Sequence, residues 1–322
     1  MKGVRFHEHG GPEVLRYEEL PDPEPGEGDA VIRLSAVGVN FVDTYRRAGA
    51  YPVELPHLLG SEGAGEVVGL GPGVDGFSVG DRVMVSGGRG AYAELVVAST
   101  KRLVKLPDGF DEATAAALPT QGGTAHCLAT STDPLGDGDT CLIHAGAGGV
   151  GLLLIQIAKM RGARVITTVS TEEKAALARE AGADEVVLYT QEDFVAAVKR
   201  ITDGEMLPVV YDAVGKTTFE GSIDCLRPRG MLVLFGQASG AVPPLDPQVL
   251  NLKGSLFLTR PNLGHYTQTR EEFEWRSGDL IAWAGSGRLK VRIGERLPLA
   301  DAAEAHRRLE GRLTTGKVIL LP

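Results

Sequence analysis

The chain has 322 residues, which is long for a single hydrophobic core and indicates two domains. Hydrophobic residues make up 43% of the sequence and charged residues 23%, as in ordinary soluble globular proteins. The net charge of −9 disfavours generic binding to nucleic acid, and no apolar run is long enough to span a membrane. The N-terminal segment is charged, and three widely spaced cysteines form no CxxC pair, so we expect a cytoplasmic protein.

Short apolar runs alternate with Gly and Pro clusters from residue 1 to about residue 120. A period of two between turn signals is typical of antiparallel strands, so this stretch predicts a β-rich domain. Its strands are predicted at Ala30–Val37, Gly63–Leu70, Arg82–Val85 and Ala91–Val97.

Strands and helices alternate from about residue 121 to residue 262. Repeated βα units with nearly continuous apolar strands indicate a parallel sheet that is covered on both faces. Ser170 and Glu173 fit a capping box at the start of one helix. The strands are predicted at Thr140–Ala145, Ala163–Val169, Glu185–Tyr189, Val209–Ala213, Met231–Phe235 and Ser255–Thr259. The helices are predicted at Gly149–Arg161, Thr171–Ala181, Glu192–Thr202 and Thr217–Leu226.

The last 60 residues do not continue the βα pattern. They predict helices at Arg270–Ala284 and Ala300–Glu310 and strands at Lys290–Glu295 and Lys317–Leu321. This mixture is better explained by a return to the first domain than by a seventh βα unit. We therefore expect a β-rich domain from residues 1–120 and 263–322, and a doubly wound α/β domain from residues 121–262.

A glycine-rich turn connects the first strand of the α/β domain to its first helix. Its spacing is G-x-G-x-x-G: the first glycine permits a tight turn, the second lets the main chain approach a pyrophosphate, and the third lets helix and strand pack closely. The helix start then favours an anion. This context predicts a Rossmann-type dinucleotide site. The residues expected to contact the dinucleotide are Gly146, Gly148, Gly149, Val150 and Gly151.

The end of the second strand of this domain bears on the choice between NAD and NADP. NAD sites usually have an acidic residue there that binds the ribose, but residues 166–171 contain none. Ser170 leaves room for a 2′-phosphate, and Lys174 lies one turn into the next helix. These residues favour NADP. The alternative is that Ser170 only caps the helix and Lys174 is an ordinary surface residue.

The layout of a β domain interrupted by a βα domain resembles the medium-chain dehydrogenase/reductase superfamily. Its zinc alcohol dehydrogenases have a Cys after the strand that corresponds to Ala30–Val37 and a Gly-His-Glu sequence further on. This chain has Asn40 and Gly60-Ser61-Glu62 instead, without the thiolate and imidazole donors that zinc prefers. We therefore expect no metal site, and a structural role for Glu62.

Within the zinc-free branch, the chain resembles the NADPH:quinone oxidoreductases (zeta-crystallin-like) over essentially its whole length. The resemblance implies a GroES-like catalytic domain beside the Rossmann domain. The turn has Gly146 where members of that family often have Ala. The matching segments are Asn40–Tyr45 with Tyr51, Ala147–Gly151, Val210–Gly215, Phe235–Gln237, Leu258–Pro261 and Gly316.

The resemblance implies hydride transfer from NADPH to a quinone in a cleft between the domains, and a homodimer in which Ser255–Thr259 extends the sheet. The implied catalytic residues are Asn40, Asp43, Tyr45 and Tyr51. Tyr45 or Tyr51 would give a proton or hydrogen bond to the quinone, with water as the competing donor. The other cofactor contacts that the resemblance implies are Thr124, Lys174, Tyr189, Phe235, Gln237 and Arg312, of which Lys174 and Tyr189 would bind the 2′-phosphate. Ser170 is a further cofactor candidate because of its position after the second strand.

The missing zinc ligands are consistent with a quinone substrate. A quinone is already electron-poor, so positioning of two rings can supply most of the catalysis without a Lewis acid. An NADPH-dependent enone reductase would use the same fold but would need a placed acid for the α-carbon. A third alternative is a non-enzymatic NADPH-binding protein with a structural or RNA-associated role, although the net charge of −9 argues against RNA.

Overall fold

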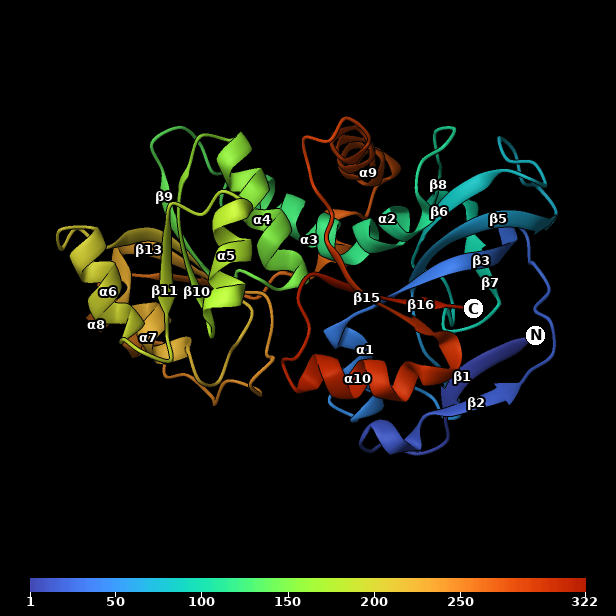
Figure 1. Cartoon of the computed structure of the whole chain (residues 1–322), viewed down its shortest axis with the longest axis horizontal. Coiled ribbons are helices and arrows are strands. Elements are labelled where there is room, and N and C mark those ends of the chain that lie inside the picture. Colours follow the sequence, from blue (N-terminus) through green and yellow to red (C-terminus); the bar gives the residue numbers. More distant parts are fainter. The chain divides into compact units, whose positions relative to one another are not determined.

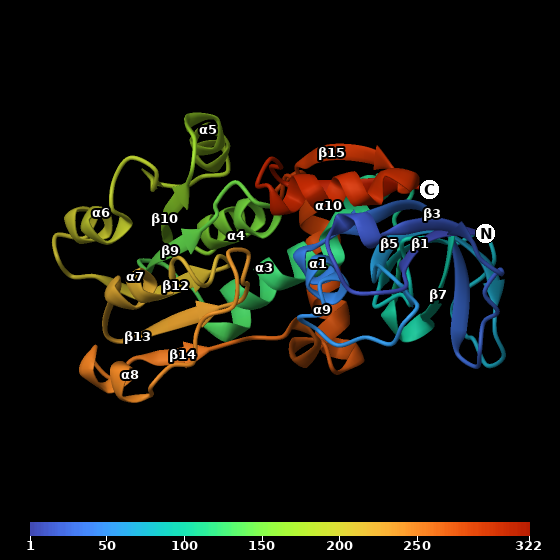
Figure 2. The same ribbon diagram turned by 90° about the horizontal axis from the view of Figure 1, so that it is seen from below.

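The computed structural model describes residues 1–322, which divide into two units. The first unit comprises Met1–Gly123 and Thr269–Pro322, and the second comprises Thr124–Gln268. The first unit has two sheets and the second has one, and each unit has its own buried hydrophobic cluster (Figures 1 and 2). None of the helices combines the length and the apolar character that crossing a lipid bilayer requires.

The first unit is built on a seven-stranded sheet. Its strand order is β15-β16-β3-β5-β6-β8, with β7 paired to β3, and a smaller sheet has the order β2-β1-β4. The strands from the N-terminal segment are β1 (Lys2–Phe6), β2 (Arg16–Glu19), β3 (Asp29–Val39), β4 (His57–Leu58), β5 (Glu62–Leu70), β6 (Arg82–Ser86), β7 (Leu95–Ser99) and β8 (Leu103–Lys105). The helices of this segment are α1 (Phe41–Arg47) and α2 (Glu112–Ala117).

The C-terminal segment completes this sheet. It forms α9 (Arg270–Gly285), β15 (Ile293–Pro298), α10 (Ala302–Glu310) and β16 (Lys317–Leu321). Strand β16 pairs antiparallel with β3 and parallel with β15, so it lies between two strands. The sheet of the first unit therefore depends on residues from both ends of the chain.

The strand predicted at Ala91–Val97 is wrong in its first half, because β7 begins only at Leu95. Tyr92 instead exchanges single backbone hydrogen bonds with two other segments: its N–H donates to Leu59 and its carbonyl accepts from Val4. The apolar run is buried for this reason and not because it continues the ladder.

The second unit is a six-stranded parallel sheet with the order β11-β10-β9-β12-β13-β14. Helix α4 covers one face, and α6 and α7 cover the other (Figure 2). This arrangement confirms the predicted doubly wound fold. Its strands are β9 (Thr140–His144), β10 (Arg164–Val169), β11 (Glu185–Leu188), β12 (Leu207–Asp212), β13 (Leu226–Leu234) and β14 (Phe257–Thr259). Its helices are α3 (Gly123–Cys127), α4 (Gly149–Met160), α5 (Glu172–Glu180), α6 (Phe194–Ile201), α7 (Phe219–Asp224) and α8 (Gln248–Leu252).

Candidate functional site

The glycine turn lies between the carboxyl end of β9 and the start of α4. A Cβ on Gly146 would lie 2.1 Å from Oγ1 of Thr167, and one on Gly151 would lie 2.3 Å from the Ala145 carbonyl oxygen. Both positions therefore require glycine because the chain packs tightly there. At Gly148 the nearest atom is the Ala145 carbonyl oxygen, at 3.2 Å, so this glycine has more room.

The packing around Gly146 involves the side chain of one residue of the neighbouring strand β10. Thr167 is fully buried in β10, and its hydroxyl donates to the Ile143 carbonyl at 2.6 Å. The Thr167 side chain thus fills the space that an alanine methyl group at residue 146 would need. The Gly and Thr residues at these two positions form a matched pair.

Residues expected to recognise a 2′-phosphate gather at the carboxyl ends of β10 and β11. The Tyr189 N–H donates to the Val169 carbonyl at 3.2 Å, and the Thr190 hydroxyl donates to the Ser170 carbonyl at 3.0 Å. Tyr189 is 42% exposed, and Lys174 lies in the first turn of α5. The fold therefore brings these residues of two separate βα units to one edge of the sheet.

The prediction that Ser170 caps α5 is wrong by one residue. Thr171 is the N-cap, and its side chain accepts a hydrogen bond from the Lys174 N–H at 3.3 Å. The strand continues through Val169 and the helix begins at Glu172, so Ser170 lies one residue before the cap. The Ser170 hydroxyl is thus not needed for capping.

A buried polar network ties three strand ends of the second unit together. His144, the last residue of β9, contacts the hydroxyls of Thr168 at 2.8 Å and Ser222 at 3.1 Å. Ser222 in turn donates to Asp212 at 2.7 Å, and the Asp212 carboxylate accepts from the N–H groups of the turn that follows β12. Burial lowers the pKa of His144, so a neutral imidazole bridges the hydroxyls.

The remaining cofactor candidates belong to several different elements of the two units. Phe235 and Gln237 follow β13, where the Phe235 N–H donates to the Asp212 carbonyl at 2.8 Å. Thr124 is half-buried in α3. Arg312 belongs to the first unit and follows α10 with a positive φ of 58°.

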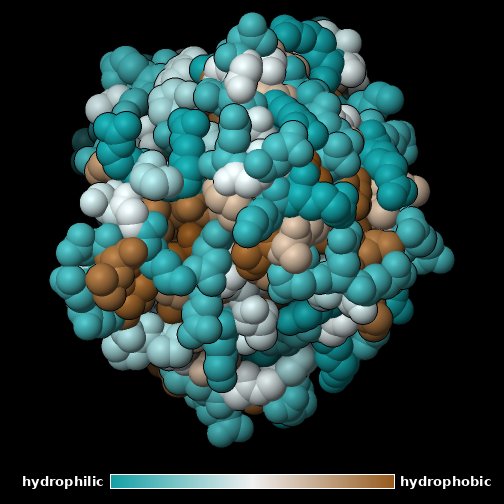
Figure 3. Space-filling view, turned by 90° about the vertical axis from the view of Figure 1, so that its left-hand side faces the viewer, coloured by the Kyte–Doolittle hydropathy of each residue, from teal (hydrophilic) through white to brown (hydrophobic).

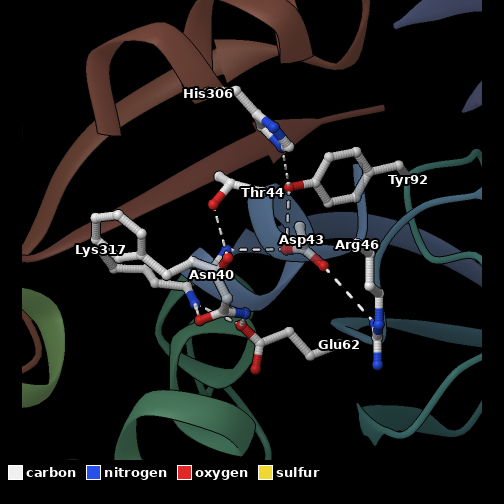
Figure 4. Close-up of polar contacts among 9 residues, drawn as sticks. Asn40, Asp43, Thr44, Arg46, Glu62, Tyr92, His306 and Lys317 are labelled. Atoms are coloured by element: carbon white, nitrogen blue, oxygen red, sulfur yellow. Dashed lines mark hydrogen bonds and ion pairs between the residues drawn. The ribbon is translucent and has the colours of Figure 1, made fainter. Parts of the chain in front are cut away.

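In the first unit, two buried polar clusters surround the start of α1 (Figure 4). In one of them, the side chain of Asn40 contacts Glu62 and Lys317, and the ammonium of Lys317 forms an ion pair with Glu62. The exposed fraction is 1% for the side chains of both Lys317 and Glu62, and 5% for Asn40. We call these three residues the Asn40 cluster.

The second cluster is centred on Asp43, whose side chain is 1% exposed. One carboxylate oxygen, Oδ2, accepts from the Asn40 N–H at 2.9 Å and from the Tyr92 hydroxyl at 3.2 Å. The other, Oδ1, has no hydrogen bond and lies 4.0 Å from the guanidinium of Arg46. Burial raises the pKa of Asp43 to about 6, against the stabilising hydrogen bond from Asn40.

Tyr92 belongs to a series of hydrogen bonds that connects Arg47, His306 and Asp43. Its hydroxyl lies 3.1 Å from Nε2 of His306, and Nδ1 of His306 lies 3.0 Å from the guanidinium of Arg47. Arginine can only donate, so Nδ1 accepts, Nε2 carries the proton and donates to Tyr92, and Tyr92 donates to Asp43. Burial and the charge of Arg47 lower the pKa of His306 to about 3, so the ring stays neutral.

Tyr45 and Tyr51 are more accessible than Asn40 and Asp43. Their rings meet edge to face with centroids 5.4 Å apart, and Tyr51 is 38% exposed. The Tyr51 N–H donates to the Tyr45 carbonyl at 3.2 Å. The four catalytic candidates therefore lie on or beside α1, two of them buried and two reaching the surface.

Sequence reasoning missed Lys317, Tyr92, His306 and His144. One feature of the sequence could have pointed to Lys317. It is the first residue of an otherwise apolar terminal strand, so it is buried when that strand enters the core. Tyr92 contacts Asp43 across 49 residues of sequence and His306 across 214. Patterns among neighbouring residues in the sequence do not predict such contacts.

The residues at the former zinc-ligand positions do not fit a metal ion. The Glu62 carboxylate is bound by the ammonium of Lys317, by the Asn40 amide and by the N–H of Thr120 at 2.7 Å. Ser61 stands where zinc enzymes have histidine. In the whole chain, no three His, Cys, Asp or Glu side chains lie close enough together to hold a metal ion.

Comparisons with known proteins agree on one family. The model of the alcohol dehydrogenase GroES-like domain matches residues 26–108, and that of the zinc-binding dehydrogenase matches residues 149–281. A quinone oxidoreductase of Pseudomonas aeruginosa is 48% identical over 100% of this chain and 99% of its own length. A 2-haloacrylate reductase of a Burkholderia species is 42% identical over 98% of both chains.

A solved structure gives the same result. The Escherichia coli quinone oxidoreductase in complex with NADPH is 42% identical and covers 100% of both chains with a TM-score of 0.98. Similarity of this extent in both sequence and fold establishes the family. The chain belongs to the quinone oxidoreductases of the medium-chain dehydrogenase/reductase superfamily.

Proposed function

We propose that this protein is an NADPH-dependent quinone reductase. The observation that carries the proposal is the full-length match to quinone oxidoreductases, one of them solved with NADPH. The glycine turn supports it independently, because its tightest positions, Gly146 and Gly151, admit no side chain and Gly148 has the most room. The reaction needs no metal, in agreement with the residues that replace the zinc ligands.

The second unit would hold the dinucleotide. The N–H groups of Gly149, Val150 and Gly151 at the start of α4 would bind the pyrophosphate, because a helix N-terminus attracts an anion. Ser170, Lys174 and Tyr189 would hold the 2′-phosphate. When bound, NADPH supplies the hydride. The further contacts that we propose are Thr124, Phe235, Gln237 and Arg312.

The first unit would hold the quinone. Tyr45 and Tyr51 reach the surface beside α1, and their hydroxyls can donate to a quinone oxygen. Transfer of a hydride to a quinone leaves a hydroquinone anion, which takes up one proton from such a hydroxyl or from water. Asn40 and Asp43 belong to the two buried clusters at the start of α1.

A steady-state assay tests the proposal. NADPH and NADH are compared as donors to 1,4- and 1,2-quinones, with Lys174→Ala alongside. Loss of an ionic contact to the phosphate should weaken NADPH binding by roughly tenfold and leave NADH binding unchanged. Equal use of NADH by the wild type, or an unchanged affinity of Lys174→Ala for NADPH, would contradict the phosphate site.

A second candidate is the reduction of activated alkenes. It is favoured by the 2-haloacrylate reductase, which is 42% identical over nearly the full length. Enones and 2-haloacrylate are therefore included in the acceptor panel. Turnover of these acceptors without turnover of quinones would replace the first candidate by the second. Tight NADPH binding without turnover of any acceptor would favour a non-enzymatic role.

We also propose a homodimer. Strand β14 is the last strand of its sheet, so one side of its backbone is unpaired. Leu252, Phe257 and Leu258 are 77%, 55% and 37% exposed at this edge. Figure 3 shows hydrophobic patches on a largely hydrophilic face. Phe257→Lys should convert the dimer to a monomer in sedimentation analysis, whereas a monomeric wild type would refute the proposal.

A cytoplasmic location fits the cysteines. Cys127, Cys141 and Cys225 are all buried and unpaired, as expected in a reducing compartment. Cell fractionation tests this location directly.

A further inference from the structure

The side-chain amide of Asn40 is held at both ends. Its Nδ2 donates to Oε1 of Glu62 at 2.5 Å, and its Oδ1 accepts from Nζ of Lys317 at 2.9 Å (Figure 4). A carboxylate can only accept and an ammonium can only donate, so the amide has a single allowed orientation. The side-chain amide of an asparagine without such partners could rotate by 180°. The same rotation of Asn40 would place its N–H groups against the ammonium of Lys317.

The two residues that hold Asn40 are themselves fixed. Glu62 and Lys317 form an ion pair, and the second oxygen of Glu62 accepts from the Thr120 N–H at 2.7 Å. Lys317 is the first residue of β16, which lies between β15 and β3. The backbone of Asn40 is held as well, because its N–H donates to Asp43. The orientation of the amide thus depends on residues of two different strands, β5 and β16, and of helix α1.

Stability alone does not account for this arrangement. Both charges are 1% exposed, and the desolvation of two buried charges offsets most of their attraction. Apolar residues of similar volume often replace a buried ion pair without loss of stability. What apolar residues cannot supply is a fixed direction for the neighbouring amide.

The fixed amide has one hydrogen-bonding group to spare. Nδ2 carries two hydrogens, and one of them is used by Glu62. The second is a donor whose direction is set before any ligand arrives. A donor fixed in advance stabilises charge that develops on an acceptor oxygen, because it need not reorganise during the reaction.

We propose that Glu62 and Lys317 are positioning residues for the reductase reaction: they orient the Asn40 amide so that its second N–H donates to the acceptor oxygen that gains negative charge. This inference rests on the proposed function, and it assigns a role to the buried ion pair that stability does not explain. Substitution of either residue lowers kcat through Asn40 and leaves the affinity for NADPH unchanged.

A double-mutant cycle on kcat tests the proposal. Lys317→Met and Glu62→Gln should each lower quinone turnover roughly tenfold or more, as removal of a fixed donor does. In an Asn40→Ala background, the same substitutions should cause no further loss. Lys105→Met, at an exposed ion pair with Asp81 in the same unit, is the matched control and should retain full turnover. Additive losses in the Asn40→Ala background would overturn the proposal.

A paired substitution separates positioning from stability. Glu62→Leu with Lys317→Met replaces the ion pair by apolar side chains of similar size. The melting temperature should stay within a few degrees of the wild type while turnover falls as in the single variants. Wild-type turnover by this double variant would show that the ion pair orients nothing that the reaction needs.

The orientation of the Asn40 amide can also be tested by NMR spectroscopy, which does not depend on quinone turnover. The chain has only three asparagines, Asn40, Asn251 and Asn262, so selective ¹⁵N-asparagine labelling gives three side-chain amide pairs. Asn40→Ala identifies the pair that belongs to Asn40. Its two protons should be widely separated in the wild type, because one of them donates to a carboxylate, and should collapse together in Glu62→Gln and Lys317→Met. Unchanged signals would overturn the proposal, whereas an inactive wild type with the expected signals would count against the proposed function only.

Discussion

The environment of Asp43 is unfavourable for the ionised form of its carboxyl group. Its carboxylate is buried and has one oxygen without a hydrogen bond, which is why burial raises its pKa to about 6. An ionised carboxylate in such a place destabilises the fold. Groups that are retained under these conditions are concentrated at functional sites, in keeping with the position of Asp43 on α1 between Asn40 and Tyr45.

The raised pKa predicts a specific dependence of stability on pH. The folded state binds the Asp43 proton more tightly than the unfolded state, whose reference pKa is 3.8. The contribution of this group to stability is therefore fully present below about pH 4 and is lost as the pH rises through about 6. The free energy of unfolding of Asp43→Asn, relative to wild type, should rise across this window by about 3 kcal/mol at most.

Denaturant titrations at a series of pH values measure this difference. Asp81→Asn is the control with the opposite sign, because hydrogen bonding to Lys105 lowers the pKa of Asp81. The loss of folding free energy caused by Asp81→Asn should become smaller as the pH falls. A flat difference between wild type and Asp43→Asn from pH 4 to pH 7 would contradict the raised pKa.

Tyr92 should control the ionisation of Asp43. Its hydroxyl donates to the carboxylate at 3.2 Å and so stabilises the charged form. Tyr92→Phe should raise the pKa of Asp43 by about one unit, as expected for loss of a hydrogen bond to a charged group. Carboxyl ¹³C chemical shifts in ¹³C-aspartate-labelled protein give this pKa directly. Tyr17→Phe, at an exposed tyrosine, should leave it unchanged; an unchanged pKa in Tyr92→Phe would show that the hydrogen bond contributes nothing.

At the scale of elements, the glycine turn is determined by its fit to β10. Thr167 fills the space that a methyl group at Gly146 would occupy, while His144 and Thr168 join the ends of β9 and β10. The turn is thus one side of a packed interface between two strands and a helix. Substitutions in β10 should therefore change the conformation of the turn even where the substituted residue does not contact the cofactor.

Gly146→Ala tests this fit. The new methyl group would lie 2.1 Å from the Thr167 hydroxyl oxygen, so the substitution should destabilise the second unit by about 1–3 kcal/mol, the usual effect of overpacking. Adding Thr167→Gly removes the three atoms nearest to the new methyl group, which all belong to the Thr167 side chain. Thermal unfolding and NADPH affinity should recover in the double variant relative to Gly146→Ala. Equal defects in the single and double variants would refute the matched pair.

At the scale of the whole molecule, the two units are assembled differently from the chain. The second unit is one continuous segment, Thr124–Gln268, whereas the first needs both termini. Strand β16 supplies the buried residues Val318, Ile319 and Leu320 to the core of the first unit, and it also supplies Lys317 to the Asn40 cluster.

Removal of residues 316–322 should therefore unfold the first unit selectively. Hydrogen exchange should show loss of protection in β3 and β5, while β9 to β13 keep theirs. Removal of Pro322 alone is the control, since it lies outside β16 and is exposed. Protection of β3 that survives the longer truncation would mean that the sheet does not depend on its terminal strand.

Much of the local structure could be predicted because it is encoded locally. The period of two in β3, the apolar strands of the parallel sheet and the glycine spacing of residues 146–151 each require only neighbours in sequence. The boundary errors have the same origin: Ser170 and Thr171 are equally good caps, and only the length of β10 decides between them. The segment 91–94 looks like a strand because most of it is buried, although its backbone hydrogen bonds are divided among three segments, at residues 2–4, 34 and 59–60.

The sequence by itself determined the fold class, the glycine turn, the family resemblance and the loss of the zinc ligands, because these depend on residue type and short spacing. Only the tertiary structure revealed the groups that hold the catalytic candidates. Lys317 meets Glu62 across 255 residues, and His306 meets Arg47 across 259. Such pairs form because β16 and α10 return to the N-terminal sheet, and the burial that results converts ordinary charged residues into a network with fixed directions and shifted pKa values.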